Sequence, residues 1–227
     1  MLYRTMPSTG DELSILGFGC MRLPTRGGRI DEERATRQLH YAIDNGVNYV
    51  DTAWPYHGGE SEPLVGEVLS SGYRDKVLLA TKMPIWDVAE TADLDRFPGE
   101  QLTRLRTDYI DFYLLHSLNA KSWQKMQDMN IFDWAEKRMA EGLFGHLAFS
   151  FHDEYPVFES IINGYDNWTM AQIQYNYIDV NYQAGKKGLD LAAERGLAVV
   201  VMEPLRGGMI AKNPPPKPVE GVWEKSD

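Results

Sequence analysis

The alternation of short apolar runs with helix-like segments predicts an α/β fold, specifically a (β/α)8 TIM-type barrel with an N-terminal β-hairpin. Several of the runs are apolar without alternation, which is typical of parallel strands that are covered on both faces. Turn residues separate the runs from segments with helical periodicity. The predicted strands are residues 15–19, 47–51, 77–81, 111–115, 147–150, 171–174 and 197–202.

The remaining elements follow from caps and turn residues. Residues 3–14 predict the small hairpin, because Pro, Ser, Thr, Gly and Asp cluster at its centre. Gly27-Gly28 predicts a loop. Asp31 predicts the N-cap of a helix from Glu32 to about Asn45, and Gly46 predicts its end. Further helices are predicted at about residues 61–70, 94–105, 131–141, 154–162 and 185–195.

The predicted barrel is one strand short of closure. After Met202 the chain gives a Gly207-Gly208 turn and then becomes rich in Lys, Asn and Pro. A parallel barrel of seven strands would leave open edges, which are costly. We therefore expect an incomplete barrel over residues 1–210, a loop-like tail over residues 211–227, and the last strand and helices beyond Asp227.

Composition and charge narrow the classes of function. The formal net charge of −10 argues against binding to nucleic acid or to an anionic membrane surface. Cys20 is the one cysteine, so neither an intrachain disulfide nor a cysteine-ligated metal site is expected. The sequence has no apolar run of membrane-spanning length, and its N-terminus lacks an apolar signal region. We expect a cytoplasmic protein.

Ionisable residues follow three consecutive predicted strands. Asp51 ends the second strand, Lys82 follows the third, and His116 follows the fourth. Tyr56 comes five residues after Asp51. Adjacent strand ends of a parallel barrel lie on one rim, where active sites are built. We therefore expect a carboxylate, a phenol, an ammonium and an imidazole to meet there as a proton-transfer site.

These groups suit the reduction of a carbonyl by hydride. The carbonyl oxygen needs a proton, and the Tyr56 phenol, with an ordinary pKa of about 10, is a weak acid at neutral pH. The Lys82 ammonium would lower that pKa, and Asp51 would hold the ammonium in place. His116 would orient the carbonyl or share the proton transfer. Taken singly, each residue also fits an ordinary role as a cap, a packed aromatic, a solvated cation or a loop histidine.

The same residues resemble the aldo-keto reductase family. The matching motifs are Asp51-Thr52-Ala53 with Tyr56, Thr81-Lys82, and Leu114-Leu115-His116, and residues 46–53 resemble the family signature. The resemblance covers about residues 3–208. It implies reduction of aldehydes and ketones with NADPH, or with NADH as the alternative, and implies Tyr56 as the general acid. It does not give the substrate, the direction of the reaction or the oligomeric state.

The resemblance also implies contacts with the nucleotide at several strand ends. Met202 takes the position where the family usually has an aromatic residue stacked on nicotinamide, and a thioether can also cover a ring face. Arg206 would reach a pyrophosphate, although the alternative is an ordinary turn. The implied cofactor-binding residues are Gly19, Cys20, Met21, Ser150, Gln174, Met202, Pro204, Leu205 and Arg206.

Three tryptophans are predicted on loops after the second, third and fourth strands. Trp54, Trp86 and Trp123 would line an apolar substrate pocket at the mouth of the barrel, or alternatively seal its rim. The histidines lack the carboxylate spacing of a two-histidine metal motif, so no metal site is expected.

Four segments resemble one microbial branch of the family. They are residues 56–60, 149–153, 172–177 and 202–208. Members of that branch often carry a cysteine-rich, ferredoxin-like C-terminal segment that holds iron–sulfur clusters. We therefore expect such clusters only if a C-terminal extension follows Asp227.

Two other classes of function stay open at this point. One is a nucleotide-sensing regulatory or redox subunit that keeps the barrel but has little turnover, which aldehyde-dependent NADPH oxidation would distinguish. The other is a barrel isomerase or aldolase that uses Lys82 as a Schiff-base nucleophile, which borohydride trapping would reveal.

Overall fold

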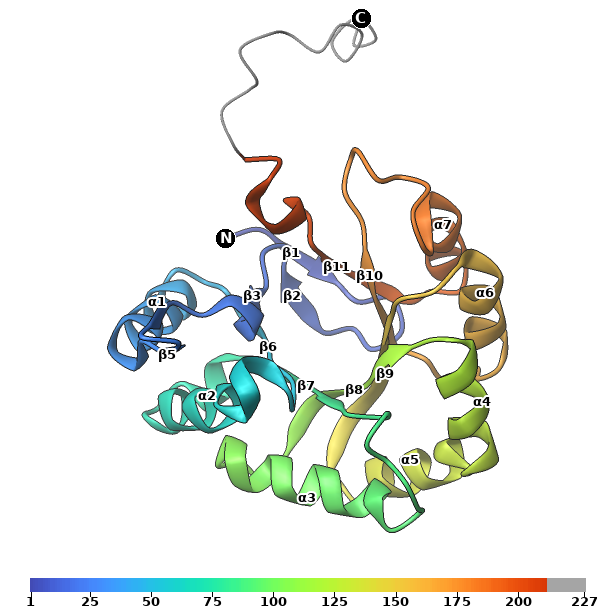
Figure 1. The fold of residues 1–227 in the computed structure, drawn as a ribbon, viewed down its shortest axis with the longest axis horizontal. Helices are drawn as coiled ribbons and strands as arrows, with labels where there is room; N and C mark the ends of the chain where they lie inside the picture. Colours follow the sequence, from blue (N-terminus) through green and yellow to red (C-terminus); the bar gives the residue numbers. More distant parts are fainter. Residues whose placement is uncertain (212–227) are drawn as a thin grey trace, which may run out of the picture.

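The computed structural model describes residues 1–211 and contains a curved, seven-stranded parallel sheet with helices on its outer side (Figure 1). The strands are ordered β11-β10-β9-β8-β7-β6-β3 across the sheet. This confirms the predicted α/β fold and the seven predicted barrel strands. Their bounds are β3 (Phe18–Gly19), β6 (Tyr49–Asp51), β7 (Leu78–Met83), β8 (Ile110–Leu118), β9 (Phe144–Phe151), β10 (Met170–Gln174) and β11 (Ala198–Met202).

The register of the central strands brings their C-terminal ends to one rim. Asp51 pairs with Ala80 between β6 and β7, and Lys82 pairs with Leu114 between β7 and β8. The interior residues of β7, β8 and β9 are buried on both faces of the sheet. This double burial explains why the strands are almost continuously apolar in the sequence.

Helices follow most of the strands, as the periodicity predicts. Their bounds are α1 (Glu32–Asp44), α2 (Ser61–Ser70), α3 (Asp93–Leu105), α4 (Ala120–Asp128), α5 (Ile131–Ala140), α6 (Tyr155–Asn163) and α7 (Gly185–Glu194). The Asp31 side chain caps α1 by accepting a hydrogen bond from the Arg34 N–H, as predicted. Among residues 1–211, no helix is long and apolar enough to cross a membrane.

One helix, α4, is absent from the sequence prediction. It begins after Asn119, whose side chain accepts a hydrogen bond from the Ser122 N–H. The Ser122 hydroxyl accepts in turn from the Asn119 N–H, which completes a capping box. The segment that we treated as a loop after the fourth strand therefore starts with a capped helix.

Two hairpins flank the sheet. The predicted N-terminal hairpin is confirmed as β1 (Tyr3–Thr5) paired with β2 (Glu12–Ser14). The loop predicted at Gly27-Gly28 is confirmed, and it is the two-residue turn of a second hairpin that we did not predict, β4 (Thr25–Arg26) with β5 (Arg29–Ile30). Both glycines have positive φ, which this kind of tight turn requires.

The N-terminal hairpin closes the end of the sheet opposite the rim with Lys82. The Asn48 side chain, just before β6, accepts from the Ser14 N–H and donates to the Glu12 carbonyl. Met6 and Leu13 of the hairpin pack into the cluster of side chains inside the curved sheet. Because this end is closed, ligands are expected at the other end, where the strands finish.

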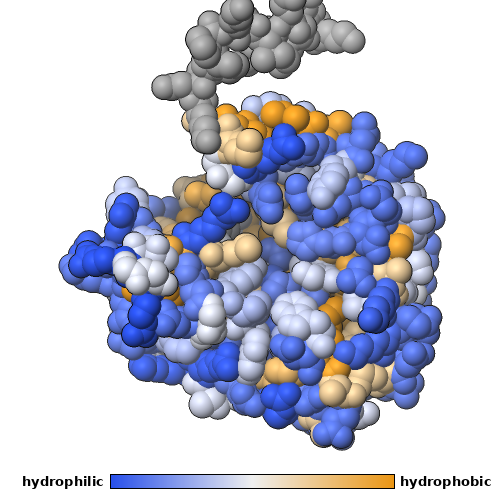
Figure 2. Space-filling view, viewed as in Figure 1, coloured by the Kyte–Doolittle hydropathy of each residue, from blue (hydrophilic) through white to orange (hydrophobic). Residues whose placement is uncertain are grey.

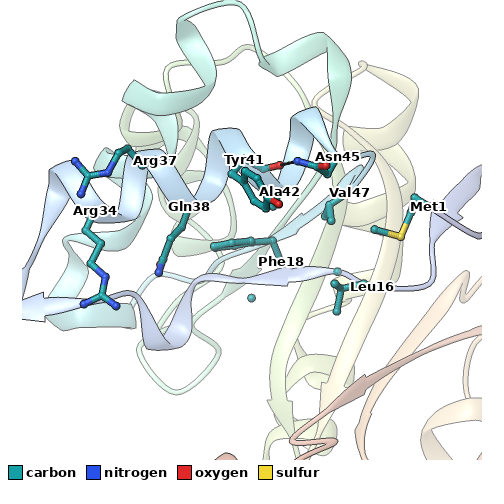
Figure 3. A pocket seen from close by; sticks show the side chains of 12 residues that line it. Met1, Leu16, Phe18, Arg34, Arg37, Gln38, Tyr41, Ala42, Asn45 and Val47 are labelled. Atoms are coloured by element: carbon teal, nitrogen blue, oxygen red, sulfur yellow. Dashed lines mark hydrogen bonds between the residues drawn. The ribbon is translucent and has the colours of Figure 1, made fainter.

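A groove of about 880 Å³ runs between β3 and α1, along the strand at one end of the described sheet. Figure 3 shows Phe18 beneath the helix, with Arg34 and Arg37 toward one end and Leu16 toward the other. The eighth strand predicted beyond Asp227 lies outside the described residues, and so does most of the predicted tail. Elsewhere the surface in the view of Figure 2 is mostly hydrophilic, in agreement with the high charge.

Candidate active site

The four residues predicted to meet at the rim come from adjacent strands and one turn. Asp51 is the last residue of β6, while Lys82 and His116 lie near the ends of β7 and β8. Tyr56 begins the turn Tyr56–Gly59, which joins β6 to α2. Adjacent strands therefore deliver three of the side chains, and the turn places the phenol beside them.

Lys82 lies at the centre of the group. Its Nζ donates to Asp51 Oδ1 at 2.7 Å, to the Thr52 carbonyl at 2.8 Å and to Tyr56 Oη at 3.3 Å. The side chain is only 1% exposed. Burial by itself lowers the pKa of Lys82, but the charges of Asp51 and Tyr56 outweigh it, so the pKa lies above its ordinary value. Lys82 is therefore an ammonium group at neutral pH.

A strained turn fixes the position of Tyr56. His57 has a φ of 54°, and Gly58 and Gly59 are also in the left-handed region. Such a conformation is uncommon for a residue other than glycine and is concentrated at functional sites. The His57 ring reaches across the rim, where its Nε2 accepts a hydrogen bond from the Leu23 N–H at 3.1 Å. The loop after β3 thus anchors the residue next to the phenol.

The acidity of Tyr56 results from opposing effects. Burial raises the pKa of the phenol, the Lys82 charge and hydrogen bond lower it, and the Asp51 charge raises it. The contribution of Lys82 has the predicted sign. The effect of burial is larger than that of Lys82, however, so the pKa of Tyr56 lies above its ordinary value of 10 and the phenol is protonated at neutral pH.

His116 provides a neutral imidazole beside the phenol. Burial, the charge of Lys82 and that of His152 lower its pKa to about 2. Its ring centroid is 6.0 Å from that of Tyr56 and 5.0 Å from that of Trp86. Its buried Nδ1 has no hydrogen-bond partner among the described residues. A neutral ring with a free nitrogen can contact an uncharged polar ligand without carrying charge into the site.

The residues implied to contact nucleotide lie at the ends of β3, β9, β10 and β11. Gly19 and Met21 are exposed, and Gln174 and Met202 are partly exposed. Pro204, Leu205 and Arg206 are exposed in the turn after β11, where the Arg206 Nε lies 3.4 Å from an Asp179 carboxylate oxygen.

Two of the implied contacts are engaged elsewhere. The Cys20 side chain is fully buried among the apolar residues beneath α1, and burial raises the pKa of its thiol. The Ser150 hydroxyl is buried and accepts a hydrogen bond from the Ser117 N–H at 2.8 Å. The whole of Cys20 is buried, and its carbonyl accepts a hydrogen bond from the Ser61 hydroxyl at 3.5 Å.

The three tryptophans occupy different surroundings. Trp86 is 49% exposed on the loop after β7, beside His116. Trp54 lies on the loop after β6, under the Arg104 guanidinium and edge-on to Phe97.

The predicted loop position of Trp123 is wrong. It lies within α4, is 5% exposed, and packs on Phe132 and Trp168 in the core outside the sheet. Of the three tryptophans, Trp86 is the one whose ring lies against His116.

The chemistry of the rim fits a nicotinamide nucleotide. It offers a buried imidazole nitrogen without a partner, the partly exposed amide of Gln174, and two arginines near the turn after β11. One is Arg206 and the other is Arg22, whose guanidinium lies against Gly207. We did not predict Arg22 as a nucleotide contact, because nothing in its local sequence indicates that its guanidinium lies beside the turn after β11. Among residues 1–211, no three His, Cys, Asp or Glu side chains are grouped as metal ligands would be.

Fold and site together define a protein of the (β/α)-barrel class with a buried lysine that contacts a half-buried tyrosine at the rim. The chain belongs to the aldo/keto reductase family, because residues 15–225 match the sequence profile of that family. Membership places it among NAD(P)H-dependent oxidoreductases.

Individual proteins agree with this assignment. An uncharacterized oxidoreductase of Bacillus subtilis, YqkF, is 28% identical over 227 residues, which cover 94% of this chain and 68% of that protein. The holo form of aldo-keto reductase AKR11C1 from Bacillus halodurans is 29% identical with a TM-score of 0.78, over 96% of this chain and 71% of the other. An aldo-keto reductase from Klebsiella pneumoniae in complex with NADPH is 25% identical with a TM-score of 0.72, over 92% of this chain and 70% of the other.

Proposed function

We propose that the protein reduces aldehydes or ketones with NADPH and that Tyr56 donates the proton to the carbonyl oxygen. One observation supports this most strongly: the Lys82 ammonium contacts both Asp51 and the Tyr56 hydroxyl. A buried ammonium is costly unless it is paired and hydrogen-bonded, so a site that keeps one beside a phenol favours proton-transfer chemistry.

The charge states of Tyr56 and Lys82 suit different roles in carbonyl reduction. The bound nucleotide would supply the hydride. Tyr56 is protonated at neutral pH and half-buried, so its hydroxyl can donate to a carbonyl oxygen at the rim. As the proton leaves, the Lys82 ammonium stabilises the negative charge that develops on the phenol oxygen.

His116 suits the orientation of an uncharged carbonyl. Because its pKa is lowered to about 2, the ring is neutral throughout the physiological range and adds no charge next to Lys82. Its unpartnered nitrogen gives a polar contact inside a largely buried site. The half-exposed Trp86 ring beside it supplies an apolar surface for the rest of the substrate.

The Schiff-base alternative is disfavoured by the state of Lys82. A lysine nucleophile needs a depressed pKa and a free amine, as in a desolvated pocket without an anion. Lys82 has a raised pKa, and Nζ donates to three oxygen atoms.

The decisive experiment measures NADPH oxidation in the presence of simple aldehydes, with wild type and Tyr56→Phe. We expect the variant to lose at least about a hundred-fold in kcat while its Kd for NADPH stays within about two-fold. Turnover retained in the variant would refute the role of Tyr56. NADPH binding by the wild type without any turnover would instead favour the regulatory subunit.

A further inference from the structure

A buried polar network surrounds the backbone of Lys82 and has no part in the chemistry described above. The Glu62 carboxylate, through Oε1, accepts hydrogen bonds from Thr81 Oγ1 at 2.7 Å and from Gln101 Nε2 at 2.6 Å. Gln101 Nε2 also donates to the Lys82 carbonyl at 3.0 Å, and its Oε1 accepts from the Tyr113 hydroxyl at 2.7 Å. These side chains come from α2, β7, α3 and β8 and are fully buried.

Ser61, the residue before Glu62, contacts Thr52, which in turn accepts a hydrogen bond from the side chain of Lys82. Its hydroxyl lies 2.9 Å from that of Thr52, and both residues are fully buried. The Thr52 carbonyl accepts the hydrogen bond from Lys82 Nζ. The first turn of α2 therefore contacts the side chain of Thr52, whose carbonyl accepts from the ammonium, and through Glu62 it also contacts the network at the Lys82 carbonyl.

The same turn is continuous with the residues that carry the phenol. The turn Tyr56–Gly59 leads through Glu60 directly into α2, which begins at Ser61. A shift at the start of α2 would therefore move Tyr56, Thr52 and Lys82 relative to one another. The network is thus connected through the chain to Tyr56 and through the Gln101 amide to Lys82.

The complete burial of the Glu62 carboxylate needs a physical explanation, because a buried charge is costly. Its cost is offset by the hydrogen bonds above and by Arg104, whose Nη1 lies 3.3 Å from Glu62 Oε2. Burial nevertheless raises the pKa of Glu62 above its ordinary value. Apolar side chains of similar volume would fill the space without this cost, but they would not fix the direction of the Gln101 amide.

We propose that Glu62 is a positioning residue for the Lys82–Tyr56 pair and acts through Thr81 and Gln101 on the end of β7. The proposal rests on the reductase function proposed above. Glu62 orients the Gln101 amide toward the Lys82 carbonyl, and this fixes the strand end from which the ammonium reaches Tyr56. The ammonium–phenol interaction depends on their separation, so a small displacement of Lys82 weakens it.

The test is Glu62→Gln, which keeps the shape of the side chain. The Gln side chain has one acceptor oxygen in place of two. If that oxygen faces Thr81 and Gln101, the NH2 group points at the Arg104 guanidinium, and if it faces Arg104, the NH2 group points at the donors of Thr81 and Gln101. We expect kcat for aldehyde reduction to fall about ten-fold, with KM and the Kd for NADPH within about two-fold. Because Lys82 lowers the pKa of Tyr56, a displaced Lys82 lowers it less, and the alkaline limb of the kcat profile moves to higher pH.

Controls separate positioning from general damage. Glu67→Gln changes an exposed carboxylate on the same helix, paired with Arg106, and should leave kcat and the pH profile unchanged. Thr81→Val removes a single donor to Glu62 and serves as the milder second variant if Glu62→Gln does not fold. Folding is checked by the thermal melting curve of each variant.

Three results would overturn the proposal. They are an unchanged kcat and alkaline limb in a folded network variant, a rise in KM with kcat unchanged, and an effect of equal size in Glu67→Gln. Crystal structures of wild type and variant give a readout that does not depend on turnover. We expect the distance from Lys82 Nζ to Tyr56 Oη to change by about 0.5 Å or more. If wild type reduces no carbonyl, the proposed function fails, and this distance alone decides the positioning role.

Discussion

The buried pair of Asp51 and Lys82 gives the most quantitative prediction. Asp51 Oδ1 and Lys82 Nζ are 2.7 Å apart, and both side chains are almost fully buried. At an effective dielectric constant of about 20, two unit charges at that distance attract by about 6 kcal/mol. Asp51→Asn removes the charge but keeps an oxygen that accepts a hydrogen bond. We therefore expect the free energy of unfolding at pH 7 to fall by about 3–5 kcal/mol.

The pH dependence of this loss has a definite sign. In wild type, burial lowers the pKa of Lys82, but Asp51 and Tyr56 raise it above the unfolded value of 10.5. That raised pKa stabilises the fold below the unfolded pKa, and the stabilisation is lost as the pH rises through the folded pKa. Without the Asp51 charge, burial dominates and the folded pKa falls below the unfolded one. Asp51→Asn then gains stability as the pH rises, so the difference in the free energy of unfolding between wild type and the variant becomes smaller.

The assay is urea denaturation of both proteins at pH 7 and at about pH 9.5, followed by circular dichroism. Asp190→Asn is the matched control, because Asp190 pairs with Lys186 on the exposed surface of α7 and should change stability little. A loss below about 1 kcal/mol for Asp51→Asn, or a gap that widens with pH, would refute this reasoning.

Three further predictions concern neighbouring groups. The pKa of His116 is lowered to about 2 in the folded protein, compared with 6.5 in the unfolded chain. This difference stabilises the fold above pH 6.5, and the stabilisation is lost progressively as the pH falls below 6.5. Urea titrations at pH 5 and 7 should show this decrease in wild type and a smaller one in His116→Asn; equal decreases would contradict the assignment. Trp123→Ala should lower the free energy of unfolding, measured by urea denaturation, by about 3–5 kcal/mol and leave KM unchanged. A raised KM without destabilisation would count against the position of Trp123 in the core. Trp86→Ala should change stability by less than about 0.5 kcal/mol but raise KM for bulky aldehydes in steady-state assays, and an unchanged KM would exclude it from the substrate pocket.

The sequence was sufficient to predict the group around Lys82 because parallel strands obey a simple rule. Residues that end consecutive strands meet on one rim, so Asp51, Lys82 and His116 follow from the strand pattern alone. Tyr56 follows from its short distance to Asp51 along the chain. The net acidity of the phenol could not be predicted, because the degree of burial at the rim is a property of the packed molecule.

Other features depend on contacts that a single sequence does not display. Glu62 has the pattern of a solvated residue on a helix, yet Gln101 and Thr81 arrive from other elements to bury it. The helix that carries Trp123 was not predicted, because its sequence is mostly polar; the structure shows that it begins at a capping box between Asn119 and Ser122. The burial of Glu62 is therefore decided by tertiary packing and not by the local sequence pattern.

The pH dependence of kcat/KM for aldehyde reduction in wild type, Tyr56→Phe and Lys82→Met tests the central claim most directly. If a phenol assisted by an ammonium gives the proton, wild type should lose activity along an alkaline limb. Lys82→Met should be slower, with that limb at higher pH, and Tyr56→Phe should lack the limb together with most of the activity. The same limb in Tyr56→Phe at a comparable rate would mean that the proton comes from another group.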